Sequence, residues 1–482
     1  MNTVKPMTLT PLALNLRATR LTMALGAVLL VSGCASNFNR PYQAPALTIP
    51  VQYSQASAAA GADATAAPSA PVGLWWMRFN DPELDRLVAE VLQGNNNLAA
   101  AAIRVRRAQL LAGLADNNLQ PIFSGGVGTS SSLPLQAGAV SVPKSSVSLS
   151  AAYEIDLWNK LGSLRDVARW EALATEQDRQ SAALALVGTT AALYWQVGFL
   201  NQSLAVTAQS IAYVQTTFDL VQMQYRAGAV SGLEVAEAQQ TLAKQQANLS
   251  ALRQQAFEAQ TALALLLDGS PGTRLANPAT LPALTLPPLD AGVPAALLGR
   301  RPDLRAAEMR LRGTFTGIDA ARASYYPAFS LTGSLGSSST QLSNVVQNPV
   351  GTLGLGMTLP FLQRTAMQLT ISVSETRYEE AVVNFRQALY TAFGDVENAL
   401  SSRQQLVQQG LRLEETLQAA RTVERLYEIR YRAGAATLGL WLDAQEKRRT
   451  ADIAVAANRL ARLKNQVVVY QALGGDAVVL SP

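Results

Sequence analysis

Two stretches of the chain alternate apolar residues with small or polar ones. In residues 146–155 (SVSLSAAYEI) and 352–361 (TLGLGMTLPF) nearly every second position is apolar and the positions between are mostly serine, glycine or threonine. A period of two predicts strands that are apolar on one face and polar on the other. Weaker partner strands are predicted at 122–133 and 328–342. Their lengths match the roughly 9–11 residues that a tilted membrane strand needs, although a soluble β-sandwich would give the same pattern.

The second pattern is helical. The chain contains no proline from Lys144 to Ser270, nor from Phe361 to Ser481. Apolar residues in both segments step by three and four, as at 211–225 and 453–470, which predicts helices packed side by side. An ordinary helical bundle would show the same spacing. We expect long helices and their return partners at 163–226, 234–267, 365–431 and 440–473, preceded by shorter helices at 98–118 and 303–325.

Matching residues recur in the two halves of the chain at a constant offset. Pro327 follows Pro121 by 206 positions, and Gly434 follows Gly228 by the same 206. An offset shared by both ends of the unit predicts a tandem duplication.

Two nearly identical segments lie in the middle of the helical regions. They are QYRAGAVSGLEVAEAQ at 224–239 and RYRAGAATLGLWLDAQ at 430–445. A glycine inside a helical pattern predicts a helix that ends, turns sharply and starts again. Each segment is therefore expected to be the tip of a helical hairpin.

Composition narrows the chemistry. The 482 residues include one cysteine and no histidine, which excludes histidine-based acid–base catalysis, histidine metal ligands and an intrachain disulfide. Basic clusters at 104–107 and 447–449 have no interleaved aromatics and indicate solvated helix faces. Ser141 and Lys144 match the Ser-x-x-Lys acyl-enzyme spacing without its partner motifs, and no nucleotide-binding loop is present. We therefore expect that the protein is not an enzyme and that it binds no cofactor and no metal ion.

The N-terminus predicts export. Arg17 and Arg20 precede an apolar run, 21–31, that is too short to span a bilayer, and small residues lead to Cys34. This arrangement is similar to a bacterial lipoprotein signal, in which Cys34 becomes the lipidated first residue. A buried free thiol is the alternative. Residues 34–74 are rich in proline, alanine and serine and predict an extended tether.

Four membrane strands cannot close a barrel, because the smallest barrels have about eight. Open edges are not tolerated in lipid, so the chain must oligomerise. A dimer would supply eight strands and a trimer twelve. The small polar inner face favours the wider, open barrel.

Several motifs in order resemble one family. They are Trp75-Trp76 with Asp81-Pro82, the segment from Tyr153 to Trp158, Arg301-Pro302-Asp303-Leu304, Tyr326-Pro327 and Tyr431-Arg432-Ala433-Gly434. Together they resemble the TolC-type outer-membrane efflux factors, and within them the NodT-like lipoproteins.

The resemblance implies a mainly α-helical chain with membrane β-strands. Long antiparallel hairpins would form a periplasmic α-barrel, and four strands per subunit would join a 12-strand trimeric β-barrel. The chain would be an outer-membrane channel of a Gram-negative bacterium that conducts drugs or other small molecules. Its implied partners are itself, as a homotrimer, outer-membrane lipid, a periplasmic adaptor and an inner-membrane pump of the RND class. The alternatives are a lipid-anchored adaptor and a structural lipoprotein without a pore.

The resemblance also gives the tips a role. The acid of the Leu-Asp-Ala motif, here Asp443, would ring the periplasmic aperture, with Glu237 as its counterpart in the first repeat. The family often has a second acid at the position of Leu440 and a basic residue at that of Ala436. Apolar contact through Leu440 and Trp441 is therefore expected to contribute to the seal. Adaptor docking is expected at both tips, at Arg226, Ala227, Gly228, Ala229, Arg432, Ala433, Gly434 and Ala435.

These expectations divide the chain into successive segments. They are a signal peptide (1–33), the tether (34–74), a first repeat (75–272), a proline-rich linker (273–299), a second repeat (300–476) and a tail (477–482). Within the repeats we expect β-hairpins at about 122–157 and 328–361, and helical hairpins at 161–268 and 365–473.

Overall fold

The structure is a computed structural model that describes residues 41–46, 49–54, 74–133, 135–136, 140–268, 276–282 and 294–475. The predicted signal peptide and Cys34 lie outside these residues. The chain forms two compact units. Unit 1 contains residues 1–45, 108–172 and 309–383, and unit 2 contains residues 46–107, 173–308 and 384–482. Helices α5 and α9 contribute residues to both.

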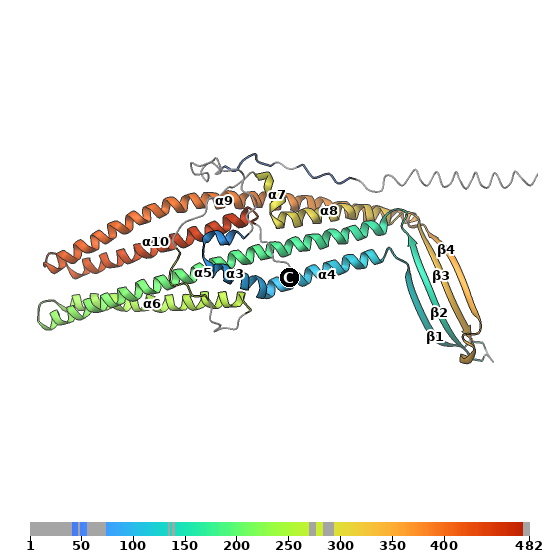
Figure 1. Ribbon diagram of the computed structural model, residues 1–482, viewed down its shortest axis with the longest axis horizontal. Coiled ribbons are helices and arrows are strands. Elements are labelled where there is room, and N and C mark those ends of the chain that lie inside the picture. Colours follow the sequence, from blue (N-terminus) through green and yellow to red (C-terminus); the bar gives the residue numbers. More distant parts are fainter. Residues whose placement is uncertain are drawn as a thin grey trace, which may run out of the picture. The chain divides into compact units, whose positions relative to one another are not determined.

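Unit 1 is built on one antiparallel sheet in the order β1-β2-β3-β4 (Figure 1). The strands are β1 (Ile122–Ser132), β2 (Val142–Ile155), β3 (Ala328–Ser339) and β4 (Pro349–Thr358). Among the described residues, β1 pairs only with β2 and β4 only with β3. Both strands therefore present an open edge.

The register sorts the side chains of the sheet onto two faces. Leu149 lies opposite Gly125 and Leu335, whereas the next residue, Ser150, lies opposite Ser124 and Ser334. The hydroxyls of Ser124 and Ser150 are 2.7 Å apart on the polar face. The apolar face is uncovered over much of its area, and Leu353, for example, is 87% exposed. The predicted alternation is confirmed.

The joint between β2 and α5 explains one of the motifs. Asp156 accepts hydrogen bonds from the backbone N–H groups of Leu161 and Gly162 and so caps the helix. The indole of Trp158 stacks on Tyr326 with ring centroids 5.2 Å apart and donates to the carbonyl of Pro327. The β2-to-α5 joint of the first repeat is thus fixed to the segment that leads from α8 into β3 of the second repeat.

The predicted helices form with shifts of a few residues at their ends. The α-helices are α3 (Pro82–Gly94), α4 (Asn96–Asn117), α5 (Lys160–Arg226), α6 (Gly232–Leu266), α7 (Leu297–Arg300), α8 (Pro302–Ala323), α9 (Arg364–Arg432) and α10 (Leu438–Ala472). Short 3₁₀ turns are η2 (Trp75–Phe79), η3 (Pro294–Ala296), η4 (Leu342–Asn344) and η5 (Pro360–Leu362). The order α4-β1-β2-α5-α6 recurs as α8-β3-β4-α9-α10, as the duplication predicts.

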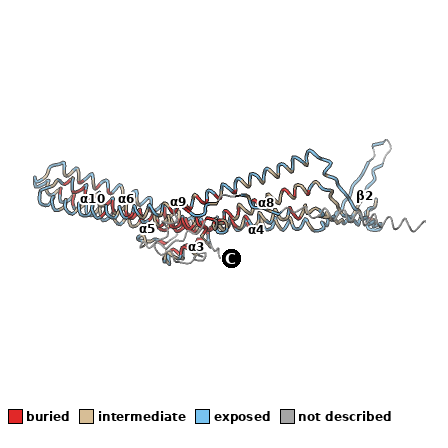
Figure 2. The backbone as a smooth tube through the Cα atoms, turned by 90° about the horizontal axis from the view of Figure 1, so that it is seen from above, coloured by how far each residue is buried: buried red, intermediate tan, exposed pale blue. Residues whose placement is uncertain are grey.

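The main core of unit 2 gathers η2 and α3 against α5, α6 and α10. Trp75 is fully buried and stacks on Tyr470, with ring centroids 5.1 Å apart. Asp81 caps α3 by accepting from the N–H groups of Glu83 and Leu84, as its position before Pro82 suggests. Figure 2 shows the buried backbone concentrated around α3.

Helix α5 contains an 18-residue stretch with a mean hydropathy of 1.4, long and apolar enough to cross a membrane by composition. Within the structure 61% of that stretch is buried. Neighbouring helices cover most of this stretch, as is typical of a helix in a protein core.

Both predicted tips are glycine-terminated turns of the Schellman type. Gly228 has φ +76° and Gly434 has φ +72°. In the first turn the N–H of Ala229 reaches the carbonyl of Gln224, and in the second the N–H of Ala435 reaches that of Arg430. Glycine occupies this left-handed conformation without steric cost, which is why the repeated motif keeps it.

The first prediction concerns this backbone requirement. Gly434→Ala should destabilise the second tip by about 1 kcal/mol, because a side chain is disfavoured at positive φ. Amide exchange around residues 430–440 should then accelerate by about fivefold. Gly394→Ala, within α9, is the control and should leave the tip unchanged while favouring the helix. Equal exchange at the tip in Gly434→Ala and the wild type would contradict the turn assignment.

Candidate functional site: the paired hairpin tips

The two hairpin tips of unit 2 pack against each other. A hydrophobic cluster, here called the tip cluster, joins α5, α6 and α10, and its buried members are Val221, Ala238, Leu438, Trp441 and Leu442. The turns that the sequence separates by about 200 residues therefore form one structural element.

Trp441 is the centre of this cluster. Its indole is 4% exposed, stacks on Tyr431 at 5.1 Å and meets Tyr213 edge-on at 6.0 Å. The sequence suggested that Trp441 contributes to an apolar seal of the aperture. In the single chain its side chain is enclosed by two aromatic rings and the α5 face, so Trp441 contributes to the packing of the two tips.

Asp443 and Leu440 lie on the exposed side of α10. The Asp443 side chain is 56% exposed and pairs with Lys447, one turn further on, at 2.7 Å. A hydrogen bond to Asp443 raises the pKa of Lys447. Leu440 is 47% exposed. Both side chains are available to line a passage.

Glu237, the counterpart of Asp443, has different surroundings. It is partly buried on α6, and its carboxylate lies beside Gly439 of the second hairpin, where an added Cβ would be 3.2 Å from Oε2. The two acids occupy equivalent positions in the repeats without equivalent exposure.

Polar bonds also connect the hairpins. The Tyr431 hydroxyl donates to Gln224 Oε1 at 3.3 Å. Two turns along α10, Glu446 accepts from the Gln245 amide of α6 at 2.6 Å and pairs with Lys244 at 3.4 Å.

Glu446 is also held by its own helix. Arg449 donates to both carboxylate oxygens, at 2.8 and 2.9 Å. These hydrogen bonds lower the pKa of Glu446 to about 2. Gln245 and Arg449 are both buried and Glu446 is partly exposed, so the α6–α10 link is a charge-assisted contact at the edge of the packed surface.

A polar cavity of about 340 Å³ separates α5 from α9 and α10. Gln445 lines it, and neither polar atom of this buried amide has a hydrogen-bond partner among the described residues. Beside it Arg448 pairs with Glu424 and Asp452, and burial raises the pKa of Glu424. The hairpins therefore pack closely in the tip cluster, whereas around Gln445 the cavity separates α5 from α9 and α10.

The turn residues themselves point outward. All eight predicted docking residues are exposed: Arg226, Ala227, Gly228, Ala229, Arg432, Ala433, Gly434 and Ala435. Among the residues that the structure describes, no group of three or more acidic, cysteine or histidine side chains could hold a metal ion.

Sequence reasoning did not identify Gln224, Gln245 or Glu446 as part of the site. The spacing of apolar residues indicates the helix face on which each of these residues lies. It does not indicate which residue from a distant segment contacts it. The available signal was the position of Gln224 at the start of the repeated segment 224–239 and the closeness of Gln245 and Glu446 to the two segments.

Taken together, the hairpins and the sheet define a class of protein. A sheet whose uncovered face is apolar and whose two edge strands are unpaired fits a segment of a membrane barrel, in which neighbouring strands would close the edges. The same chain forms long helical hairpins with exposed glycine turns. This is a subunit of an outer-membrane channel with a periplasmic helical part.

The comparisons identify the family. The sequence model of the outer membrane efflux protein family matches residues 87–269 and 293–475. The second match begins and ends 206 positions after the first, which is the offset of the duplication. The chain belongs to the outer membrane efflux protein family.

Individual relatives agree. The chain is 35% identical to the pyoverdine export outer membrane protein OpmQ of Pseudomonas putida over 430 residues, covering 87% of this chain and 91% of that protein. It is 30% identical to the antibiotic efflux pump outer membrane protein ArpC of Pseudomonas putida, covering 94% and 95%. The solved structure of the outer-membrane channel OprN superposes with a TM-score of 0.82 at 25% identity, covering 92% and 99%.

The protein is therefore an outer-membrane efflux channel, and its family consists of channel proteins rather than enzymes. The resemblance deduced from the motifs is confirmed, as are the fold class and the location. Nothing in the comparisons supports the adaptor or the pore-free lipoprotein.

The second prediction concerns the α6–α10 link. Because the folded-state pKa of Glu446 is lowered, its stabilisation is present above about pH 4.5 and is lost as the pH falls toward 2. Glu446→Gln should weaken the link by about 1 kcal/mol at neutral pH, allowing for partial exposure. Amide exchange around Gln245 should rise in this variant, and the wild type should approach it on acidification.

Glu415→Gln is the matched control, since Glu415 pairs with Arg412 on an exposed surface. It should leave exchange around Gln245 unchanged. A Glu446→Gln variant that behaves like this control would show that the link does not hold the hairpins.

Proposed function

We propose that three copies of this chain close a twelve-strand barrel and conduct small molecules across the outer membrane. The observation that carries the proposal is the pair of open edges, β1 and β4, on a four-strand sheet with an apolar face. Lipid cannot satisfy the unpaired backbone groups, so β1 of one subunit must pair with β4 of the next. Twelve strands leave a lumen, whereas eight would be filled by side chains.

Exposed apolar residues on the helices of unit 1 support the same assembly. Leu110, Leu111 and Leu114 of α4 and Leu369 and Val373 of α9 are all exposed in the single chain. A concentration of exposed apolar residues on helices marks an interaction surface. Neighbouring subunits would cover these side chains in a closed helical barrel.

Asp443 is proposed to ring the periplasmic aperture, with Leu440 beside it. Three carboxylates near one axis would repel each other and attract cations. Lys447 offsets part of this charge within each subunit. Glu237 is proposed as a secondary acid of the same region, restrained by its contact with the second hairpin.

The gate is proposed to lie at the second turn. Opening the aperture requires the second hairpin to move relative to the first. The contacts that resist this motion are the tip cluster, the Tyr431–Gln224 hydrogen bond and the Glu446 link. Trp441 belongs to this resisting set rather than to the lining of the aperture.

The exposed turns are proposed to dock a periplasmic adaptor, which connects the channel to an inner-membrane pump of the RND class. The alanine- and glycine-rich turns have small side chains that allow close approach of another helical hairpin. OpmQ exports pyoverdine and ArpC belongs to an antibiotic efflux pump, which supports small organic molecules as cargo. The energy would come from the pump, and the channel itself needs no cofactor.

The third prediction tests both conduction and the aperture. In planar bilayers the wild type should give single-channel conductance that divalent cations block from the periplasmic side. Asp443→Ala should weaken the block by about fivefold or more, because a ring of negative charge is removed. Asp219→Ala, an exposed acid on the first hairpin, is the control and should leave the block unchanged.

Two results separate the parts of this proposal. Absence of conductance in the wild type would exclude the channel, whereas conductance with an unaltered block in Asp443→Ala would exclude only the aperture assignment.

The fourth prediction concerns the anchor, since Cys34 is proposed to carry acyl chains. Cys34→Ser should abolish metabolic labelling with a radioactive fatty acid. A substitution with serine at the neighbouring small residue, Ala35→Ser, should keep it. Labelling that persists in Cys34→Ser would refute lipidation at this cysteine.

A further inference from the structure

The duplication extends from the sequence to the contacts within unit 1. In the first β-hairpin Phe123 pairs with Ala151, and in the second Phe329 pairs with Met357. Each residue of the second pair lies 206 positions after its counterpart in the first. The offset that relates the two sequences therefore also relates the registers of the two hairpins.

A salt bridge between helices repeats in the same way. Asp116 of α4 pairs with Arg169 of α5 at 3.1 Å, and Arg322 of α8 pairs with Glu375 of α9 at 2.6 Å. Each residue of the second bridge again lies 206 positions after its counterpart, but the two charges are exchanged. Since exchange of both charges keeps the attraction, the same helix contact is retained in both repeats.

One junction in the chain joins the first repeat to the second. There β2 pairs with β3, with Leu149 opposite Leu335. Beside this pairing the Trp158 indole donates to the Pro327 carbonyl at 2.7 Å. The last strand of one repeat thus meets the first strand of the following repeat. In a closed ring of identical subunits, β4 meets β1 of the partner subunit in the same order.

The offset therefore relates the junction within a chain to the junction between chains, here called the seam. At the seam each first-repeat residue is replaced by the residue 206 positions later. Each second-repeat residue is replaced by the residue 206 positions earlier, in the partner subunit. The pair Leu149–Leu335 then becomes Leu355 opposite Thr129 of the partner subunit. In this register residues 352–358 of β4 lie opposite residues 126–132 of the partner's β1.

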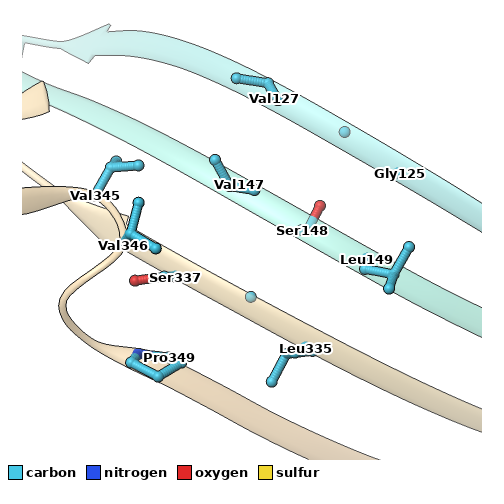
Figure 3. Close-up of a pocket in the computed structure, with 12 residues that line it drawn as sticks. Gly125, Val127, Val147, Ser148, Leu149, Leu335, Ser337, Val345, Val346 and Pro349 are labelled. Carbon is cyan, nitrogen blue, oxygen red and sulfur yellow. The ribbon is translucent and has the colours of Figure 1, made fainter.

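This register keeps the apolar face of the sheet continuous across the seam. Val127 of β1 lies opposite Val147 of β2 on the apolar face (Figure 3). Thr129 follows Val127 by two positions and so lies on the same face. Leu355 of β4 lies on this face too, two positions after Leu353. A register shifted by one residue would instead bring the apolar face of one subunit beside the polar face of the next.

The joint beside the strands is related by the same offset. Trp158 is replaced by Arg364, the first residue of α9, and Pro327 is replaced by Pro121 of the partner subunit. A guanidinium, like an indole, is planar and donates N–H hydrogen bonds. Arg364 therefore keeps the donor chemistry of Trp158 at the place where the partner subunit would arrive.

Arg364 has no evident use within its own chain. Its side chain is exposed, and it has no hydrogen-bond or ion-pair partner in the part of the chain that the structure describes. A cation at the first position of a helix also opposes the helix dipole, so Arg364 does not stabilise α9. Both observations favour a contact outside the single chain.

We propose that Arg364 of each subunit donates a hydrogen bond to the Pro121 carbonyl of the partner subunit, beside a seam in which Leu355 lies opposite Thr129 of the partner subunit. The inference rests on the proposed three-copy barrel and adds to it a register and a residue that fixes this register. Every junction of the ring, within and between chains, would then have one N–H donor near a helix start and one proline carbonyl.

Cysteine cross-linking of the full-length protein in membranes tests the register. Thr129→Cys is combined with Leu355→Cys, and in two control pairs with Leu353→Cys or Met357→Cys. All three β4 residues are exposed and lie on the apolar face. Directly opposite Cα atoms lie about 4.5–5.5 Å apart, which a disulfide can span, whereas diagonal neighbours lie about 7–8 Å apart. Oxidation with copper phenanthroline should therefore link subunits through Thr129 and Leu355 with a yield at least about fivefold above either control pair.

Arg364→Ala tests the hydrogen bond. In mild detergent the fraction of trimer that survives heating should fall about fivefold or more, because each seam loses a charge-assisted bond. Arg364→Trp should retain the trimer, since it supplies the donor that the junction within the chain uses. A role of the positive charge alone would not be rescued by tryptophan. Arg386→Ala, at another exposed position of α9, is the control and should leave the trimer unchanged.

The outcomes separate this inference from the three-copy barrel. Preferred linkage in a control pair, or linkage in no pair while the trimer persists, would overturn the register. Equal heat resistance of Arg364→Ala and Arg386→Ala would overturn the hydrogen bond, and the cross-linking stays decisive if Arg364→Ala fails to fold. Absence of a trimer in the unsubstituted protein would instead contradict the barrel itself. This unsubstituted protein, which keeps Cys34, also gives the background of the cross-linking.

Discussion

Unpaired backbone groups cannot remain in lipid, and this constraint determines the rest of the molecule. The sheet has four strands, apolar on one face, with β1 and β4 each paired on one side only. In water such edges could be hydrated, but in a bilayer they must find partners. We therefore propose that the sheet is part of a larger ring and that the same neighbouring subunits cover the exposed apolar residues of α4 and α9. The channel follows from an incomplete subunit.

The duplication gives both repeats the same hairpin, and sequence differences between the repeats make the two tips distinct. Both repeats keep the glycine at positive φ, because each hairpin needs the same turn. The residues after the turn differ. Where the second repeat has Trp441 and Asp443, the first has Val235 and Glu237. The second hairpin thereby gains a buried aromatic anchor and an exposed acid, which makes the two tips unequal partners rather than copies.

Much of the fold could be predicted because it is encoded locally. The period of two in 146–155 predicts a strand, and the absence of proline is consistent with the long helices. Gly228 and Gly434 predict the turns at the hairpin tips. Contacts between distant segments could not be predicted in this way. Gln245 and Glu446 meet across 201 positions, and no periodicity names such a pair. The rings of Tyr213 and Tyr431 that enclose Trp441 could not be predicted for the same reason, since periodicity gives the helix face of Trp441 but not its neighbours.

The central claim is that a subunit with two open strand edges completes itself with two copies of itself. Native mass spectrometry of the detergent-solubilised, full-length protein measures this directly. The account predicts a complex with the mass of three chains that persists after detergent is removed in the gas phase. A stable species of one or two chains, with no trimer at any protein concentration, would contradict it.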